Sequence, residues 1–447
     1  MWLKSISLIQ PLFCSAIFAN LNEYSLNMTV VSESHTVLWV PRYWPAVGGT
    51  EFHSHELAQC LSHDHRVTVL ANCTSTETFQ QPLTQSAVLV NASDAFDGAV
   101  RTITLAPARM SAKLLSALGK HHAKSKVARR LYQIFFVSAY KASVKNLIGD
   151  ADRVHFIYNG LTESAILAAE VASELNIPFI FTPNVLDTAM VGSDWDSAGF
   201  HMLYDCADQL IALTTHEANW LASHGVSKSK ITVVPYGPIL QPRRNELEFG
   251  GVAKLLSSRY ILFLGRLVPE KGYQLLLQAF EELIKNDSDL KLVMVGPADK
   301  ASRGLIQAMN KRLGEPAVSL IENVSQPTKT ALLEEAQLLC VPSKRESLGG
   351  VYIESMASST PVIALDRPVS HCVIDHRKNG LLVAEDIASV KAGMQMLLDD
   401  PTLRADMARA GRIKVDRLYN WRSVTDQILS VYAKVGAESR ADIKKAA

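Results

Sequence analysis

Short apolar runs recur along this chain and alternate with segments whose apolar residues have helical spacing. In the first half the runs are Thr36–Val40, Arg66–Leu70, Arg153–Ile157, Pro178–Thr182, Gln209–Leu213 and Ile231–Val234. In the second half they are Tyr260–Leu264, Lys291–Val295, Ala317–Ile321, Gln337–Val341 and Pro361–Ala364. Helical patterns such as Glu51–Ser62, Tyr273–Ile284 and Gly350–Ala357 lie between them. Because strands that are buried on both faces have continuous apolar sequences, this alternation predicts parallel sheets covered by helices.

A polar stretch with the Gly250–Gly251 pair interrupts this alternation at residues 241–258, which predicts a linker between two α/β domains. We therefore expect a disordered extension at 1–35, an N-terminal domain at 36–240, a C-terminal domain at 259–415, and a helix at 416–447 that returns to the N-terminal domain. Each domain is expected to be a doubly wound, Rossmann-like parallel sheet. Since ligands bind beyond the carboxyl ends of such strands, we expect the chemistry in a cleft that the two domains face.

The composition excludes several classes of protein. Lys and Arg number 45 against 44 Asp and Glu, a balance that argues against a dedicated nucleic-acid-binding protein. The six cysteines are scattered without a Cys-x-x-Cys pair, so neither a zinc site nor a disulfide scaffold is expected, and free thiols fit a reducing compartment. The apolar run Ile6–Ala19 is too short to span a membrane. We favour an extension there over the alternative, a cleaved secretory signal.

The first candidate binding motif is Gly265-Arg-Leu-Val-Pro-Glu-Lys-Gly272, which directly follows an expected strand. A step from strand to helix presents unpaired backbone N–H groups at the helix N-terminus, and these favour an anion. Arg266 adds a planar guanidinium and Lys271 a point charge, so that the two together suit a diphosphate. From the spacing alone, a solvated loop with two ordinary surface cations explains the motif equally well.

The second candidate motif is Glu346-Ser-Leu-Gly-Gly-Val-Tyr-Ile-Glu354. Its Gly349–Gly350 pair removes side-chain bulk where a helix is expected to begin, so backbone amides can approach a ligand. Glu346 precedes the helix and Glu354 lies about one turn into it, so each carboxylate can accept hydrogen bonds from hydroxyls at one end of an extended ligand. Taken alone, the motif is better explained as an acid-rich helix N-terminus, which stabilises the helix dipole.

Together the two motifs resemble those of the retaining GT-B glycosyltransferases of glycosyltransferase family 4. The shared pattern is Gly-Arg-Leu-x-x-x-Lys-Gly, then Pro-Ser-x-x-Glu-Ser-Leu-Gly-x-Val-x-x-Glu, then Pro-Val-Ile, with Gly48-Gly-Thr-Glu51 in the first half. The resemblance extends over residues 36–435. It implies a GT-B fold and an enzyme that moves a sugar from a UDP- or GDP-sugar to an acceptor hydroxyl with retention, in the synthesis of cell-surface polysaccharide or glycolipid.

The resemblance also assigns a role to each matching position. Arg266 and Lys271 would grip the donor diphosphate without a metal ion, and Glu346 would orient the donor sugar. Glu354 would accept hydrogen bonds from the ribose hydroxyls. The remaining donor-binding positions act through the backbone: Gly49 would let the N-terminal loop close over the donor, the chain near Val324 would face the nucleobase, and Leu348, Gly349, Gly350 and Val351 would line the sugar and phosphates.

Three features of the first half are candidates for the acceptor side. Asn184 stands where many members of the family carry a His, so no proton-sharing side chain is expected at that position. His155 is a second acceptor-side candidate, and a hydrogen-bonded His at a strand end is an equal alternative. Asp194-Trp-Asp196 resembles a metal-binding acid pair but follows no clear strand, so we expect a solvated acceptor-side loop and no metal cofactor.

A block of basic residues lies between Asp97 and Asp150, where no acidic residue occurs. It contains Arg101, Arg109, Lys113, Lys120, Lys124, Lys126, Arg129, Arg130, Lys141 and Lys145, interleaved with Leu and Phe. Such a stretch is typical of a surface that binds anionic lipid, and a solvated basic face is the alternative. Because lipid-linked acceptors are common in the resembling family, we expect one here, with a cytoplasmic protein in peripheral contact with the inner face of an anionic membrane.

Two alternatives to a glycosyltransferase stay open. One is another GT-B enzyme, such as a nucleotide-sugar epimerase or a phosphorylase, and the other is a non-catalytic protein that binds sugar nucleotides. The presence of both Glu346 and Glu354 weighs against the non-catalytic protein. Dehydrogenases and P-loop enzymes are excluded because the chain has neither of their glycine-rich phosphate-binding motifs.

Overall fold

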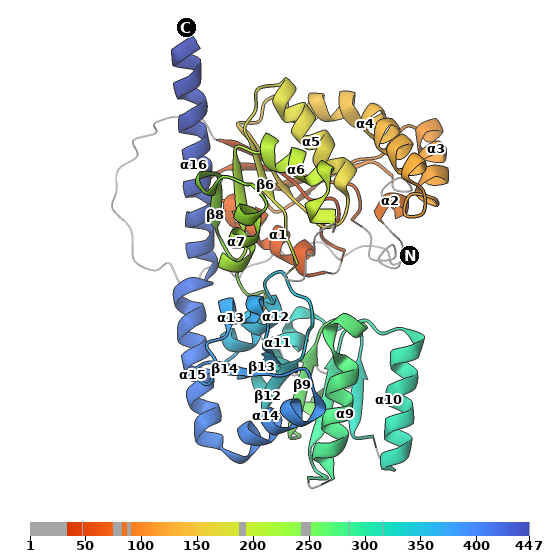
Figure 1. Cartoon of the computed structure of the whole chain (residues 1–447), viewed down its shortest axis with the longest axis vertical. Helices are drawn as coiled ribbons and strands as arrows, with labels where there is room; N and C mark the ends of the chain where they lie inside the picture. Colours follow the sequence, from red (N-terminus) through yellow and green to blue (C-terminus); the bar gives the residue numbers. More distant parts are fainter. Residues whose placement is uncertain are drawn as a thin grey trace, which may run out of the picture. The chain divides into compact units, whose positions relative to one another are not determined.

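The computed structural model describes residues 34–46, 48–74, 83–86, 91–186, 194–242, 252–285, 287–314 and 316–446 (Figure 1). These residues form two separate β-sheets with helices between the strands. The first sheet has eight strands in the order β3-β4-β2-β1-β5-β6-β7-β8, and the second has six in the order β11-β10-β9-β12-β13-β14. Among the described strands, only the β3–β4 pair is antiparallel. The predicted α/β class with two parallel sheets is confirmed.

The first sheet contains β1 (His35–Trp39), β2 (Arg66–Ala71), β3 (Ser93–Asp97), β4 (Val100–Thr104), β5 (Arg153–Ile157), β6 (Phe179–Thr182), β7 (Gln209–Ala212) and β8 (Ile231–Val233). Strand β1 lies between β2 and β5, with Val37 opposite both Thr68 and Val154. Six of the strands coincide with predicted apolar runs. The prediction missed β3 and β4, which form a hairpin whose outer strand β3 is largely exposed and carries no apolar run.

Alternate residues of β1 enter different hydrophobic clusters on the two faces of the first sheet. Val37 and Trp39 belong to one cluster, and Leu38 belongs to the other. Other strands of the sheet and the helices between them also contribute to these clusters. The helices are α1 (Gly49–Leu61), α2 (Leu83–Ser86), α3 (Arg109–Gly119), α4 (Lys126–Ile148), α5 (Thr162–Glu174), α6 (Ala198–Cys206) and α7 (Thr215–Ser223). Burial on both faces explains why the strands read as continuous apolar runs.

The second sheet contains β9 (Tyr260–Leu264), β10 (Lys291–Val295), β11 (Val318–Ile321), β12 (Leu338–Val341), β13 (Val362–Leu365) and β14 (Gly380–Val383). Its helices are α8 (Ala253–Leu256), α9 (Tyr273–Ile284), α10 (Lys300–Leu313), α11 (Gln326–Glu335), α12 (Gly350–Ala357), α13 (Pro368–Val373), α14 (Ile387–Asp399) and α15 (Pro401–Leu418). Five strands coincide with predicted runs, and the short edge strand β14 was not predicted. Since β9 and β12 are neighbours and parallel, the loops that follow them lie at the same edge of the sheet.

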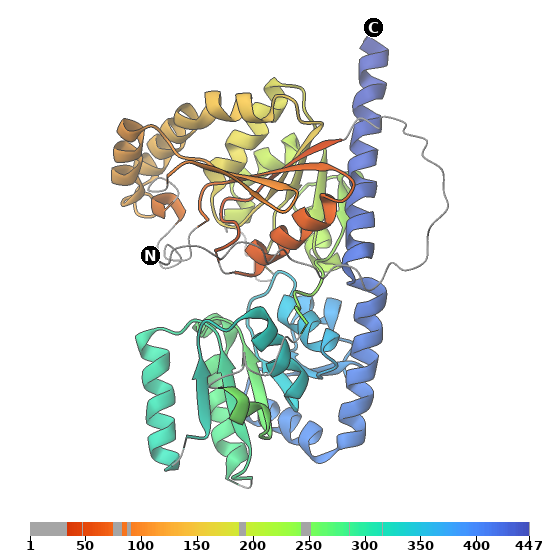
Figure 2. The same ribbon diagram turned by 180° about the vertical axis from the view of Figure 1, so that it is seen from behind.

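The last helix, α16 (Trp421–Ala446), packs on the first sheet's side of the structure (Figure 2). Val424, Ile428, Val431 and Tyr432 join the same hydrophobic cluster as Leu38. The indole nitrogen of Trp421 donates a hydrogen bond to the carbonyl of Pro238 at 2.8 Å. The helix was expected at 416–447 and begins instead at Trp421.

Several expected segments fall partly or wholly outside the described residues. The expected extension at 1–35 lies outside them except for Ser34 and His35, and His35 already belongs to β1. Within the expected linker, residues 243–251 lie outside them, and α8 begins soon afterwards. In the part of the chain that the structure covers, no helix combines the length and apolar character needed to span a membrane.

Tyr432→Phe tests how α16 is held. The change removes the hydroxyl that lies 2.9 Å from Nδ1 of His155 and leaves that ring nitrogen buried without a partner. We expect the free energy of unfolding to fall by about 1–3 kcal/mol in urea denaturation. Asp426→Asn, at an exposed position of the same helix, is the control and should change it by less than about 0.5 kcal/mol. Identical urea midpoints for Tyr432→Phe and the wild-type chain would contradict this role.

Candidate functional site

The loops after β9 and β12 are packed directly against each other. Gly272 begins α9 with φ of 71°, and a Cβ atom there would overlap the carbonyl oxygen of Pro342. Only glycine fits a left-handed residue at such a close approach. The amide of Lys344 donates to the carbonyl of Glu270 at 2.7 Å, and the hydroxyl of Ser343 reaches the same carbonyl at 3.3 Å. The two sequence motifs therefore form one structural unit.

This packing brings Lys271 and Glu346 into contact. The Nζ atom of Lys271 lies 2.6 Å from Oε1 of Glu346, and the two side chains are 22% and 12% exposed. The predicted cation of the first motif and the first carboxylate of the second motif thus meet at a partly buried position that still reaches solvent. A carboxylate next to the ammonium fixes the direction of the lysine side chain, while its remaining hydrogens can still be donated to a ligand.

Helix α12 begins at this same edge. Gly349 has φ of 83°, and a Cβ there would overlap the ring of Tyr352. The Tyr352 hydroxyl donates to the carbonyl of Val341 at the end of β12, which fixes the start of the helix. Leu348 is buried beneath the turn, and Val351 is partly buried. No described side chain caps the first amides of α12, so these N–H groups can donate hydrogen bonds to an anion.

Glu354 lies one turn into α12 and is buried. Its Oε1 atom is 3.0 Å from Nζ of Lys329, which α11 supplies. Lys329 was not recognised in the sequence, where it is simply a cation within a helix. Val324 lies in the turn before α11 and packs partly on the core of the second sheet. The predicted ribose-binding carboxylate and the predicted base-facing turn are therefore joined through α11.

The N-terminal domain approaches this edge with helix α1. Gly49, at the start of α1, is exposed and has open space where a Cβ atom would lie. Glu51 is buried beside the preceding loop, and burial raises its pKa, while the charges of Arg42 and Arg266 oppose that shift. His53 lies one turn after Gly49, and a Cβ atom on Gly350 would come within 3.1 Å of its Cε1 atom. Residues from α1 thus meet the start of α12.

His155 does not lie on an acceptor surface, which corrects the acceptor-side prediction. The side chain is 1% exposed, its Nδ1 pairs with the Tyr432 hydroxyl at 2.9 Å, and its Nε2 pairs with Oγ1 of Thr182 at 2.8 Å. Burial lowers its pKa to about 3. The imidazole is a neutral core group that joins β5 and β6 to α16, which was the alternative left open.

Asn184 lies in the buried segment after β6, with φ of 52°. Its amide nitrogen donates to the carbonyl of Tyr158 at 2.7 Å, and its oxygen accepts a hydrogen bond from the Tyr236 hydroxyl at 3.1 Å. Both ends of the side chain are therefore engaged within the protein. Asn184 shapes this end of the first sheet and supplies no titratable group.

The Asp194-Trp-Asp196 segment forms a single helical turn. Asp196 lies 3.1 Å from Nε2 of His201, and the side chain of Asp194 lies outside the described part of the chain. Across the residues whose placement is given, no group of three or more His, Cys, Asp or Glu side chains is arranged to hold a metal ion.

Two regions of the chain match known protein families. Residues 47–238 match the family described as Glycosyltransferase Family 4, and residues 246–414 match Glycosyl transferases group 1. The D-inositol 3-phosphate glycosyltransferase of Thermomonospora curvata is 28% identical over 51% of this chain and 57% of its own length. The phosphatidyl-myo-inositol mannosyltransferase of Mycolicibacterium smegmatis is 32% identical over 42% of this chain and 49% of its own length. The chain thus spans about half the length of these curated relatives.

Solved structures extend the likeness to the whole fold. The structure of HepE from Anabaena, in complex with UDP and glucose, superimposes on 89% of this chain and 99% of its own with a TM-score of 0.65 and 14% identity. At that identity the likeness concerns the fold alone. The two family matches, at residues 47–238 and 246–414, contain every described strand of both sheets except β1. The chain therefore belongs to the GT-B glycosyltransferases, as a member of glycosyltransferase family 4 with its glycosyl transferases group 1 domain.

Proposed function

We propose that this protein transfers a sugar from a UDP- or GDP-sugar to an acceptor hydroxyl with retention, in the synthesis of a polysaccharide or glycolipid. The observation that carries the proposal is the contact between Lys271 and Glu346 beside the uncapped start of α12. It places a cation, a hydroxyl-binding carboxylate and free backbone amides at one edge of the sheet. A sugar diphosphate presents the matching groups, anionic oxygens next to hydroxyls.

The donor would lie along the edge formed by the loops of β9 and β12. Arg266 and Lys271 would neutralise the diphosphate as it leaves, with the amides of Gly350 and Val351 as further donors. Glu346 would accept a hydrogen bond from the sugar. Glu354, held by Lys329, would do the same for the ribose at the other end. The complex of HepE with UDP and glucose supports a nucleotide-sugar donor in a protein of this fold.

Retention would follow from attack on the face that the diphosphate leaves. The acceptor oxygen would bond to the anomeric carbon as the bond from that carbon to the phosphate oxygen breaks, and the departing phosphate would take the acceptor proton. No enzyme base is then required. The engagement of His155 and Asn184 in hydrogen bonds within the fold supports this route.

Lys271→Ala and Arg266→Ala test the diphosphate assignment. Loss of one preorganised charge contact costs about 3 kcal/mol of transition-state stabilisation, so each variant should transfer sugar about a hundredfold more slowly or worse. Release of nucleoside diphosphate in the presence of acceptor is the measurement. Lys344→Ala is the matched control, because Lys344 lies in the same pair of loops and pairs with Glu385 at 2.5 Å. Turnover by both variants at the rate of the control would remove the assignment.

The reaction needs no divalent metal in this proposal, since Arg266 and Lys271 supply the positive charge at the leaving group. Transfer should therefore continue at an unchanged rate after treatment with EDTA and should not rise when Mg²⁺ or Mn²⁺ is added. The initial rate of nucleoside diphosphate release measures this directly. An activity that EDTA abolishes and Mn²⁺ restores would contradict the proposal and return attention to Asp194 and Asp196.

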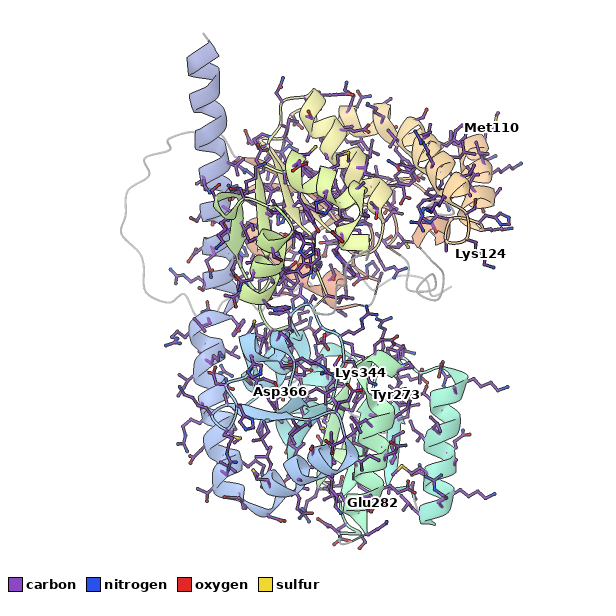
Figure 3. All side chains as sticks on the ribbon, in the orientation of Figure 1. Met110, Lys124, Tyr273, Glu282, Lys344 and Asp366 are labelled. Atoms are coloured by element: carbon purple, nitrogen blue, oxygen red, sulfur yellow. The ribbon has the colours of Figure 1, made fainter. Side chains whose placement is uncertain are left out.

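The proposed acceptor is lipid-linked, and the surface of α3 and α4 would hold the protein at an anionic membrane. Both helices expose large apolar side chains, with Met110 at 87% exposure and Val127 at 69%. Met110 is labelled on α3 in Figure 3. Leu114, Leu131, Ile134 and Phe135 are exposed as well. The labelled Lys124 lies between the two helices (Figure 3). A face that combines apolar and basic side chains suits a lipid headgroup region.

The basic part of this face is smaller than the sequence suggested. Arg101 pairs with Asp94, and Glu174 pairs with both Lys141 and Lys145. Seven basic residues remain for which no ion pair occurs among the described residues: Arg109, Lys113, Lys120, Lys124, Lys126, Arg129 and Arg130. These seven lie on α3, on the start of α4 and between them. We define them, with the exposed apolar residues above, as the basic face.

A cytoplasmic location on the inner side of the membrane completes the proposal. Among the described residues, Cys60, Cys206, Cys340 and Cys372 form no disulfide bond, which fits a reducing compartment. The membrane association would be reversible and electrostatic, because each Lys or Arg near an anionic surface contributes about 1 kcal/mol.

Charge reversal on the basic face tests the membrane role. Arg129→Glu with Arg130→Glu should lower binding to vesicles that contain phosphatidylglycerol about tenfold or more, since two attractive contacts become repulsive. Co-sedimentation at low and high salt is the measurement, and 1 M salt, which shortens the Debye length to about 3 Å, should weaken wild-type binding. Lys300→Glu with Lys311→Glu, exposed on α10, makes the same charge change elsewhere and should bind normally. Equal recovery with neutral and anionic vesicles would favour a soluble acceptor.

A further inference from the structure

His53 carries a fixed tautomer. The residue lies on α1, and its Nδ1 atom is 2.5 Å from the carbonyl oxygen of Gly49. Because a carbonyl oxygen only accepts hydrogen bonds, Nδ1 must carry the proton. In a neutral imidazole the other nitrogen then holds a lone pair and acts as an acceptor.

The acceptor nitrogen of His53 is buried, and no donor among the residues described here forms a hydrogen bond with it. The carbonyl of Gly237 also lies near the ring, but a carbonyl oxygen cannot donate to the lone pair. Burial lowers the pKa of the ring to about 4, and the charge of Lys329 acts in the same direction. The carbonyls of Gly49 and Gly237 and the carboxylate of Glu56 oppose that shift without cancelling it. The ring is therefore neutral near pH 7, and a buried lone pair without a partner is unfavourable, so a ligand that donates a proton to it would gain affinity.

Two aromatic side chains hold the ring in place. Tyr236 stacks on it with ring centroids 4.5 Å apart and planes 19° apart, and Trp421 lies at 6.3 Å. Tyr236 comes from the segment that leaves the first sheet, and Trp421 opens α16. Rotation of the imidazole toward another hydrogen-bond partner would therefore disrupt these ring contacts.

The ring faces the first residue of α12. A Cβ atom on Gly350 would lie 3.1 Å from Cε1 and 3.5 Å from Nε2 of His53. This is the helix start whose amides have no side-chain cap, next to Lys271 and Glu346. The buried Nε2 atom therefore lies next to the helix start where the proposed donor would bind.

We infer that Nε2 of His53 accepts a hydrogen bond from a hydroxyl of the donor sugar. The inference rests on the proposed function and adds a residue of the N-terminal domain that recognises the sugar itself. A fully ionised phosphate oxygen has no proton to donate, so the neutral ring cannot bond the diphosphate. A sugar hydroxyl can. Because Nε2 is buried in this structure, the inference requires α1 and α12 to separate when the sugar binds.

Two substitutions separate the nitrogens of His53. His53→Asn keeps a hydrogen-bond donor near the position of Nδ1 and removes Nε2, whereas His53→Gln places a polar atom near the position of Nε2. We expect His53→Asn to weaken binding of a nucleotide-sugar about tenfold, which corresponds to about 1.4 kcal/mol. The same variant should bind the nucleoside diphosphate within about twofold of the wild-type chain. His53→Gln should retain most of the preference for the sugar nucleotide.

Titration calorimetry with UDP, UDP-glucose, GDP and GDP-mannose gives these affinities. Equal loss of both ligands in His53→Asn, or loss of neither, would overturn the role of His53 while leaving the donor site intact. If the wild-type chain bound none of the four, the proposed donor site would fail and the inference with it.

Nitrogen-15 NMR of the wild-type chain provides a test that needs no folded variant. The Nε2 resonance of His53 should move upfield with the nucleotide-sugar, because its lone pair becomes hydrogen-bonded, and should stay in place with the diphosphate. A resonance that moves identically with both ligands would overturn the inference.

Discussion

The close packing of the loops after β9 and β12 is the constraint on which the candidate site depends. Gly272 leaves room for the carbonyl of Pro342, and the carbonyl of Glu270 accepts hydrogen bonds from both the amide of Lys344 and the hydroxyl of Ser343. With the loops joined in this way, Lys271 and Glu346 meet at 2.6 Å. A side chain at Gly272 would separate the loops and with them the cation from the carboxylate.

Buried polar groups stabilise the end of the first sheet. Glu217 is buried and accepts hydrogen bonds from the amides of Val185 and Leu213, each at 2.7 Å, so it joins the segments that follow β6 and β7. Burial raises its pKa to about 8, and the two amide hydrogen bonds oppose that shift. Asn184 and Tyr236 continue this network toward His53. The end of the first sheet is therefore shaped by groups that are engaged with one another.

The sequence predicts the two sheets well because strands that are buried on both faces have continuous apolar sequences, such as Tyr260–Leu264. The sequence does not predict β3, because this edge strand is exposed and polar and therefore has no continuous apolar run. Arg266, Lys271, Glu346 and Glu354 could be proposed as site residues because each stands in a local motif next to a predicted strand end, and because the two motifs together resemble those of a known family.

Contacts between residues that are distant in the sequence could not be predicted from local motifs. The partner of Glu354 is Lys329, and the neighbour of His53 is Gly350, and neither pairing has a local pattern. His155 is a core residue because it pairs with Tyr432, which a helix distant in the sequence supplies. Likewise, Lys141 and Lys145 of the basic block form ion pairs with Glu174 of the following helix. In each case the deciding residue lies in another element, and only the packing of the chain reveals it.

The central claim is that the edge formed by the loops after β9 and β12 binds a nucleotide-sugar. A thermal-shift measurement on the full chain tests this claim most directly. A ligand that binds only the folded state stabilises it by about 2.7 kcal/mol at a hundred times its dissociation constant. Among UDP-, GDP- and ADP-sugars, the account predicts that a UDP- or GDP-sugar raises the unfolding midpoint by several degrees without added metal. A midpoint that none of these ligands raises, at concentrations up to the millimolar range, would contradict the account.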